Sequence, residues 1–189
     1  MNPVIQNIST HPAFASLRFS GAYALKAGIL PYDRGASGEV RFLVAAPKPV
    51  KNPDDTVPFA MARGSRRMRA AGENWVDIRS NAEMEAAISQ AAEMEAAPIT
   101  ALAEGEEELG LPASAVRVLY DCGVLAYKDY GIHCFLAQVG EGAKLLPARD
   151  SAATRWLSLQ EVQEMATGGA FNPRYLPLLE AMAAAVKPF

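Results

Sequence analysis

Residues 98–112 read Pro-Ile-Thr-Ala-Leu-Ala-Glu-Gly-Glu-Glu-Glu-Leu-Gly-Leu-Pro and combine a helical pattern with many carboxylates. Pro98 suits the first position of a helix, and Gly110 followed by Pro112 suits its end. A helix places three glutamates spaced i, i+3 and i+4 on one side: Glu104, Glu107 and Glu108. Because like charges on one face repel each other, the pattern predicts a divalent cation that prefers oxygen ligands, Mg²⁺ or Mn²⁺.

The same run has an apolar stripe on another side of the helix. Ile99, Leu102 and Leu109 form this stripe, and we expect them to pack on a sheet. An acidic helix face that is simply exposed to solvent is the alternative interpretation of the glutamates. Patterns elsewhere in the chain are needed to distinguish a metal site from a solvated face.

The stretch resembles the Nudix box, G-x5-E-x7-R-E-U-x-E-E-x-G-U, in which U is an aliphatic residue. Five positions of the second half match, at Glu104, Glu107, Glu108, Gly110 and Leu111, and Glu95 has the spacing of the earlier glutamate. Three positions depart from the pattern: Ala103 replaces the arginine, Gly105 an aliphatic residue and Ser89 the first glycine. The segment 59–64 resembles the strand that precedes the box, so Gly64 is preferred to Ser89 as the counterpart of its glycine.

The resemblance implies one α/β domain over residues 1–189, an α/β/α sandwich with a mixed β-sheet between helices. Residues 1–20 are expected to form an N-terminal arm. Placing the box glycine at Gly64 requires an insertion of about residues 65–95 before the Glu-rich helix. Within it, Ser80 and Glu83 form a capping-box pattern that predicts a helix. We expect three apolar residues to anchor the insertion in the core: Trp75, Val76 and Ile78.

The remaining elements follow from alternation, turn residues and caps. A bend is expected near Gly123, because glycine permits backbone angles that other residues avoid. Ser158 and Glu161 form a second capping box that opens a helix. Strands are predicted at 23–32, 40–46, 115–120, 122–127, 132–139 and from 154 to the Ser158 cap, with a terminal helix at 178–186.

The resemblance implies a divalent-metal-dependent hydrolase, in which water cleaves the pyrophosphate bond of a nucleoside diphosphate linked to another moiety. It assigns metal binding to Glu104, Glu107 and Glu108, and catalysis to Glu104 and Glu108. Arginine side chains provide bidentate donors for phosphate, and the basic run after the strand suits that task. The residues expected to bind the substrate phosphates are Arg63, Gly64, Arg66 and Arg67. In similar proteins a late loop adds another acidic residue, for which Glu141 and Asp150 are the candidates.

The departures from the box have predicted consequences. In the family the arginine of the box holds the following glutamate, and losing such a charged hydrogen bond costs about 2 kcal/mol. Arg63, Arg66 or Arg67 could substitute for it. Gly105 is expected to let the insertion approach the helix closely, at a cost of about 1 kcal/mol in helix propensity. Weakened hydrolysis is therefore the first hypothesis.

Two other hypotheses stay open. The chain could be a Nudix-fold module that binds a nucleotide or a protein with little or no turnover, as Ala103 and the insertion suggest. It could also be an unrelated α/β domain whose acidic helix is solvated. Metal titration separates this third hypothesis from the other two, and turnover separates the first two.

Composition limits the partners. The formal charge of −3 offers no electrostatic case for nucleic-acid binding, and no apolar run is long enough for a membrane span. Two cysteines, Cys122 and Cys134, are too few for a disulfide scaffold. The predictions are a cytoplasmic location, a small nucleotide-type substrate and, by analogy with similar proteins, a homodimer.

Overall fold

The computed structural model describes residues 3–21, 23–35, 38–49, 57–128, 130–140 and 142–186. Its strands are β1 (Val4–Asn7), β2 (Ala24–Arg34), β3 (Val40–Pro47), β4 (Ala62–Ser65), β5 (Arg67–Arg69), β6 (Val76–Asp77), β7 (Glu93–Met94), β8 (Val116–Tyr127), β9 (Tyr130–Val139) and β10 (Ser151–Ser158). Its α-helices are α1 (Asn81–Ser89), α2 (Ala97–Leu109), α3 (Leu159–Thr167) and α4 (Leu176–Ala185). Three short 3₁₀ turns complete the described elements: η1 (Pro12–Leu17), η2 (Ala113–Ala115) and η3 (Pro173–Tyr175).

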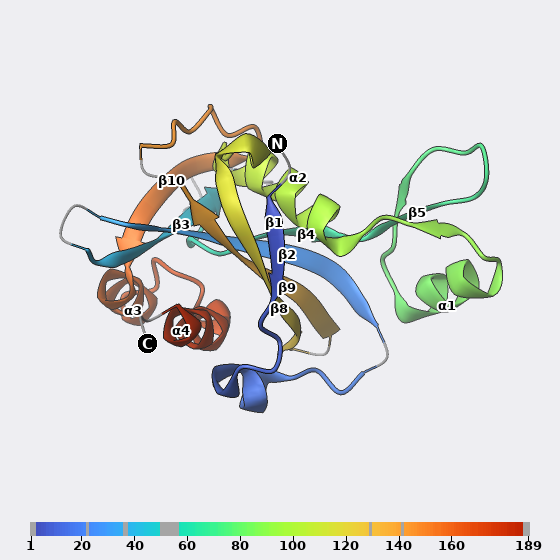
Figure 1. The fold of residues 1–189 in the computed structure, drawn as a ribbon, viewed down its shortest axis with the longest axis horizontal. Coiled ribbons are helices and arrows are strands. Elements are labelled where there is room, and N and C mark those ends of the chain that lie inside the picture. Colours follow the sequence, from blue (N-terminus) through green and yellow to red (C-terminus); the bar gives the residue numbers. More distant parts are fainter. Residues whose placement is uncertain are drawn as a thin grey trace.

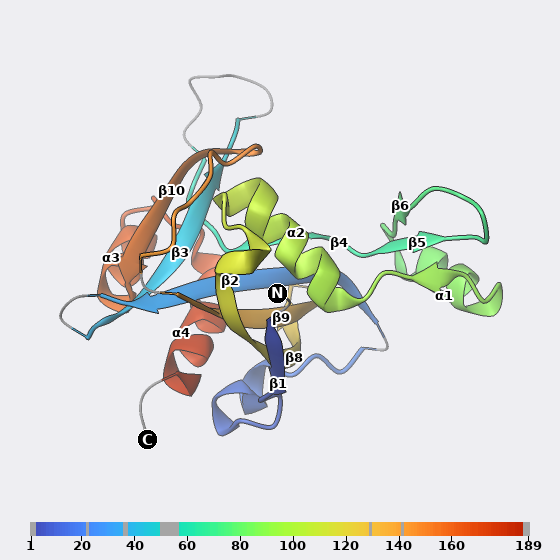
Figure 2. The ribbon, with the colours of Figure 1, turned by 45° about the horizontal axis from the view of Figure 1, so that its top comes forward.

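A seven-stranded mixed sheet forms the centre of the molecule, in the order β1-β8-β9-β2-β3-β10, with β4 paired to β2. Strand β2 runs antiparallel to β3 and β4 but parallel to β9. Helix α2 crosses one face of this sheet, and α3 and α4 cover the other (Figures 1 and 2). The predicted mixed sheet between helices is therefore confirmed.

Each face of the sheet has its own apolar core. On one face, Ala101 and Leu109 of α2 pack with Ile29 and Phe135, which are fully buried or nearly so. The core on the other face is larger and joins the sheet to α3, α4 and η1. This second core is built from Leu30, Phe42, Val162, Leu179 and Met182 among others.

The side of α2 that faces the sheet differs from the predicted stripe. Ile99 is 56% exposed, and Leu102 is only partly buried. The buried residues of the helix are Ala97, Thr100, Ala101, Gly105 and Leu109. Most of them are small, which lets the helix lie close to β2. Gly105 faces Ile29 of β2 rather than the insertion, which we expected it to contact.

Local signals in the sequence set several element ends. The capping box of Ser158 and Glu161 is present in full at the start of α3. Gly110 ends α2 in the left-handed region, at φ 66°. Strand β8 carries a register shift between Asp121 and Gly123, whose φ is 79°, where the sequence predicted a bend. Each of these features depends on a few neighbouring residues, which is why the sequence showed them.

Residues 67–94 form a small unit beside the main sheet. Strands β6, β5 and β7 make a three-stranded sheet, and α1 follows β6 (Figure 2). Ser80 caps α1 by accepting a hydrogen bond from the Glu83 backbone, as predicted. Of the expected anchors only Ile78 is fully buried; Val76 is 51% exposed, and Trp75 stacks against the guanidinium of Arg69. The unit is too small to cover all three side chains.

The N-terminal residues are more than an arm. Strand β1 adds to the edge of the main sheet, parallel to β8, and η1 packs beside α4. Phe14 of η1 is completely buried. Within the described residues, no helix is long and apolar enough to cross a membrane.

Candidate functional site

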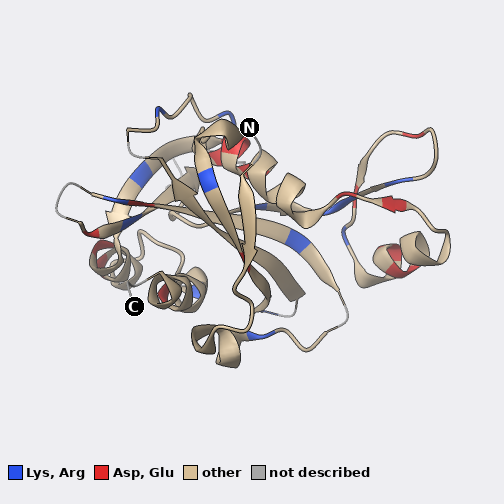
Figure 3. Ribbon diagram, viewed as in Figure 1, with Lys and Arg blue, Asp and Glu red and all other residues tan. Residues whose placement is uncertain are grey.

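The acidic residues of α2 gather on its C-terminal half, and the stretch from β4 through β5 carries arginines at positions 63, 66, 67 and 69 (Figure 3). The three predicted metal ligands, Glu104, Glu107 and Glu108, are all half-buried. They therefore do not form a freely solvated face. The carboxylates of Glu104 and Glu108 turn toward β4, however, whereas that of Glu107 turns toward Arg149.

Glu104 points at the backbone of β4. A Cβ atom added to Gly64 would overlap the Oε1 atom of Glu104, so only glycine leaves room for this carboxylate. Burial, together with the charges of Glu108 and Glu107, raises the pKa of Glu104 to about 7. Among the described residues no hydrogen bond or ion pair satisfies this group, whose charge would be relieved by a cation.

Glu108 lies one turn further along the helix. Its Oε2 atom accepts a hydrogen bond from the backbone N–H of Arg63, at 3.2 Å. Burial raises the pKa of Glu108, although this hydrogen bond and the charge of Arg63 act in the opposite direction. Strand β4 therefore positions both carboxylates: Gly64 makes space for Glu104, and Arg63 holds Glu108.

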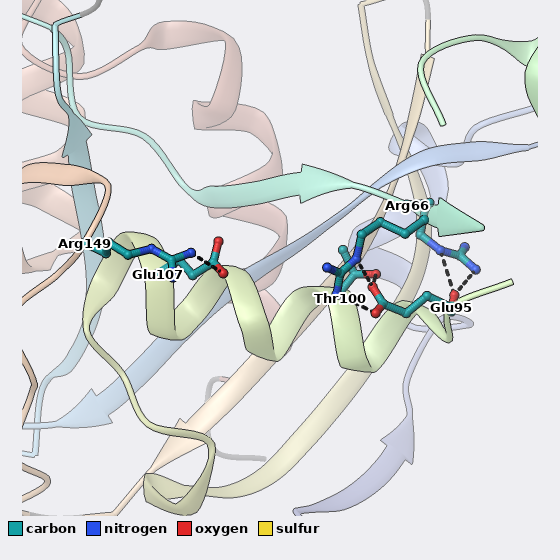
Figure 4. Close-up of polar contacts among 6 residues, drawn as sticks. Arg66, Glu95, Thr100, Glu107 and Arg149 are labelled. Atoms are coloured by element: carbon teal, nitrogen blue, oxygen red, sulfur yellow. Dashed lines mark hydrogen bonds and ion pairs between the residues drawn. The ribbon is translucent and has the colours of Figure 1, made fainter. Parts of the chain in front are cut away.

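Glu107 has a different partner. Its Oε1 atom lies 2.5 Å from Nη2 of Arg149, a residue of the loop before β10 (Figure 4). The neighbouring Asp150 has its backbone N–H bonded to the Glu107 carbonyl and adds to the electrostatic field that raises the pKa of Glu104 and Glu108. Asp150 is thus the better placed of the two late acidic candidates, since Glu141 lies outside the described residues.

The carboxylate oxygen atoms are the kind of ligand that a divalent cation prefers, but the three side chains do not converge on one point. Glu104 and Glu108 supply hard oxygen atoms one turn apart on a rigid helix, and both are destabilised in the charged form. Within the described part of the chain, however, no three His, Cys, Asp or Glu side chains converge to hold a metal ion. Because Glu107 turns to Arg149, the predicted convergence of three carboxylates is not seen.

The glutamate at the first acidic position of the box, Glu95, stands at the other end of α2 (Figure 4). Its buried carboxylate accepts two hydrogen bonds from Arg67, at 3.0 and 2.6 Å, and one from the Thr100 hydroxyl at 2.7 Å. Arg66 donates two more to the Glu95 carbonyl. Arg67 of β5 therefore fixes the start of α2. Ala103, which replaces the arginine of the box, takes no part in this contact.

Two hollows flank the acidic side of α2. The first, of about 210 Å³, is lined by Ser65, Arg67, Asp77, Thr100, Ala103, Glu104 and Glu107. The second, of about 360 Å³, is lined by Ala103, Glu106, Glu107, Leu146, Pro147 and Arg149. Both contain Ala103 and Glu107, so they meet at these two side chains. Glu108 instead lines a third hollow of about 190 Å³ beside β4.

The four predicted phosphate-binding residues are not equivalent in the structure. Arg67 lines the first hollow, and its side chain is partly exposed. Arg63 extends its side chain to the aromatic rings of Tyr127 and Tyr175, with its Nε atom bonded to the Tyr175 hydroxyl. Arg66 is engaged by Glu95, and Gly64 borders Glu104. Of the three arginines, Arg67 is thus the one that a ligand beside Glu104 would meet.

Our sequence reasoning missed Arg149 and Tyr175. Both lie far along the chain from their partners, and neither belongs to a local pattern. For Arg149 the only signal was its neighbour Asp150, already considered as an acidic candidate. Contacts of this kind come from the fold and leave no mark on the surrounding sequence.

No protein-family model matches the sequence, and no curated protein matches it. Solved structures do match. RenU, a Nudix hydrolase from M. smegmatis, is 18% identical, with a TM-score of 0.54 over 91% of this chain and 92% of that chain. The C. elegans Ap4A hydrolase is 15% identical, with a TM-score of 0.52 over 87% of this chain and 100% of that chain.

A third match is the NUDIX domain of Shewanella oneidensis NrtR, solved with ADP ribose. It is 11% identical, with a TM-score of 0.53 over 88% of this chain and 90% of that chain. At such identities the similarity concerns the fold. The chain has the Nudix fold, and the fold predicted from the sequence is confirmed.

Proposed function

Because the chain has the Nudix fold, we propose that it is a hydrolase that cleaves the pyrophosphate bond of a nucleoside diphosphate linked to another moiety. The carboxylate pair Glu104 and Glu108 is the observation that supports the proposal most directly. Both are half-buried on one helix face, and no arginine or lysine side chain among the described residues forms an ion pair with either. Two half-buried negative charges on one helix face lower the stability of the fold unless a bound ligand neutralises them.

We assign binding of Mg²⁺ or Mn²⁺ to Glu104, Glu107 and Glu108, with Asp150 beside them. When bound, such an ion neutralises charge on the phosphoryl oxygens and makes water a better nucleophile. Glu104, whose pKa is raised to about 7, suits a residue that accepts a proton from the attacking water near neutral pH. Glu108 is held in place for this task by the Arg63 backbone.

The substrate phosphates are assigned to the first hollow. Arg67 lines it, and the side chain of Arg67 is partly exposed although its guanidinium is bonded to Glu95. Gly64 leaves room for the Glu104 carboxylate beside this hollow, Arg63 extends to Tyr175, and Arg66 is bonded to the Glu95 carbonyl. Two structural neighbours, the C. elegans Ap4A hydrolase and the NrtR domain solved with ADP ribose, indicate which compounds to test first.

A Nudix-fold module that binds its ligand without turnover is the second candidate. It is favoured by the ion pair between Glu107 and Arg149, which keeps one predicted metal ligand occupied. The cytoplasmic location, the small-molecule partner and the homodimer remain predictions from the sequence.

The deciding experiment is incubation with Mg²⁺ or Mn²⁺ and a substrate panel. The panel contains ADP-ribose, dinucleoside polyphosphates, NADH, nucleotide sugars and nucleoside triphosphates, and the products are separated by chromatography. We expect turnover of at least one compound, reduced by Glu108→Gln about a hundredfold or more. Glu85→Gln is the control, since Glu85 is an exposed residue of α1 outside these hollows and its variant should keep most of the activity. Binding without turnover would favour the second candidate.

A further inference from the structure

The loop before β10 is fixed to the C-terminal end of α2 by backbone hydrogen bonds. The N–H of Leu146 donates to the Gly110 carbonyl at 2.7 Å. The N–H groups of Arg149 and Asp150 both donate to the Glu107 carbonyl, at 2.8 and 3.0 Å. The backbone of Arg149 therefore has a set position relative to the acidic face of the helix.

The side chain of Arg149 is held much less firmly than its backbone. It is 69% exposed, and its partner Glu107 is 37% exposed. Besides this pair, its Nε atom lies 3.7 Å from Asp150. Exposed ion pairs shift an equilibrium by at most about fivefold. The guanidinium can therefore leave Glu107 at little cost when a stronger ligand for that carboxylate arrives.

The two hollows along α2 provide the place to which Arg149 can turn. Both are lined by Ala103 and Glu107, so the two hollows adjoin at these residues. Arg67 borders one hollow and Arg149 the other, while Glu107 lines both. Figure 4 shows the two ends of this arrangement, with Glu95 near one end of α2 and Arg149 near the other.

We propose that Arg149 is a phosphate-binding residue whose guanidinium is held by Glu107 until a divalent cation takes that carboxylate. This inference rests on the proposed function. The cation and the guanidinium compete for the same oxygen atoms of Glu107, so binding of the first releases the second. The released guanidinium then binds an anionic phosphate of the substrate, for which its planar shape is suited.

Competition for Glu107 is measured without substrate or turnover, by Mn²⁺ titration followed by electron paramagnetic resonance. We expect Arg149→Ala to bind Mn²⁺ up to about fivefold more tightly than the unmodified protein, and Arg149→Lys to fall between them. Removing a positive charge near a metal site also tightens Mn²⁺ binding through long-range electrostatics, without any competition for Glu107. The pair Glu107→Gln and Glu107→Gln/Arg149→Ala separates the two causes, because competition predicts equal Mn²⁺ affinity in these two variants.

Phosphate binding is measured by steady-state kinetics on the best substrate of the panel. Arg149→Ala should raise KM about tenfold with little change in kcat, since the contact is made in the bound substrate as well as in the transition state. Arg174→Ala is a control, because Arg174 is an exposed arginine in η3, outside both hollows.

Equal or weaker Mn²⁺ binding by Arg149→Ala, or an unchanged KM, would overturn the role of Arg149. Failure of the proposed function itself has a different signature. In that case the unmodified protein would turn over no compound of the panel, while the Mn²⁺ titrations of the Arg149 and Glu107 variants would still decide the competition for Glu107.

Discussion

Gly105 lies on the side of α2 that packs against β2 of the sheet. It is buried in the middle of the helix, where glycine lowers helix stability relative to alanine. A Cβ atom at this position would lie 3.4 Å from the Ile29 side chain, which is an ordinary van der Waals distance. The backbone of β2 therefore leaves room for a methyl group.

We predict that Gly105→Ala raises the free energy of unfolding by about 0.5–1 kcal/mol, through the gain in helix propensity. Urea denaturation measures the change. Gly110→Ala is the matched control and should lower stability, because Gly110 has φ 66° and its Cβ would overlap the Leu146 carbonyl. If Gly105→Ala were destabilising too, the helix would be packed more tightly on β2 than this geometry indicates.

At the scale of elements, Glu95 joins β5 to the start of α2. Its carboxylate is 6% exposed and is bonded by Arg67 and Thr100. Burial alone would raise its pKa, but the hydrogen bonds from Arg67 and Thr100 and the charges of Arg67 and Arg66 lower it overall. The folded state thus favours the charged form of Glu95, and the stability of this junction depends on pH.

Since the pKa of Glu95 is lower in the folded state, its contribution is present above the ordinary value of 4.5 and is lost as pH falls through the folded value. We predict that Glu95→Gln lowers the free energy of unfolding by about 1–3 kcal/mol at pH 7, because Arg67 loses a charged partner. The difference between the two proteins should shrink below about pH 4.5. Urea denaturation at a series of pH values measures it, and a pH-independent difference would contradict this account.

At the scale of the whole molecule, the N-terminal segment completes both the sheet and the larger core. Strand β1 pairs with β8, and Phe14 of η1 is buried in the core shared with α4. The segment was expected to be an arm because its sequence shows no clear period. Its stability comes from contacts with residues more than a hundred positions away.

We predict that Phe14→Ala lowers the free energy of unfolding by about 3–5 kcal/mol, through lost burial and the cavity left behind. Val4→Ala serves as the control, because Val4 is 60% exposed and its truncation should change stability by no more than about 0.5 kcal/mol. Thermal and urea unfolding of both variants test this. A small effect at Phe14 would mean that the N-terminal segment folds onto an already complete core.

The sequence by itself determined features that depend on neighbouring residues. The ends of α2, the cap of α3 at Ser158 and the irregularity at Gly123 each arise from backbone angles and hydrogen bonds within a few positions. The spacing of the glutamates led to the resemblance, and through it to the mixed sheet between helices. The high content of apolar residues required a sizeable core, and the structure has one apolar core on each face of that sheet.

Only the tertiary structure decided where the charged side chains point. Glu95 and Arg67 are bonded across 28 positions, Glu108 and the Arg63 backbone across 45, and Glu107 pairs with Arg149 from another loop. A helix pattern places three carboxylates on one side but does not orient their last atoms, because long side chains turn to whichever partner the fold brings near. For this reason the acidic helix could be read from the sequence, whereas the separation of its carboxylates could not.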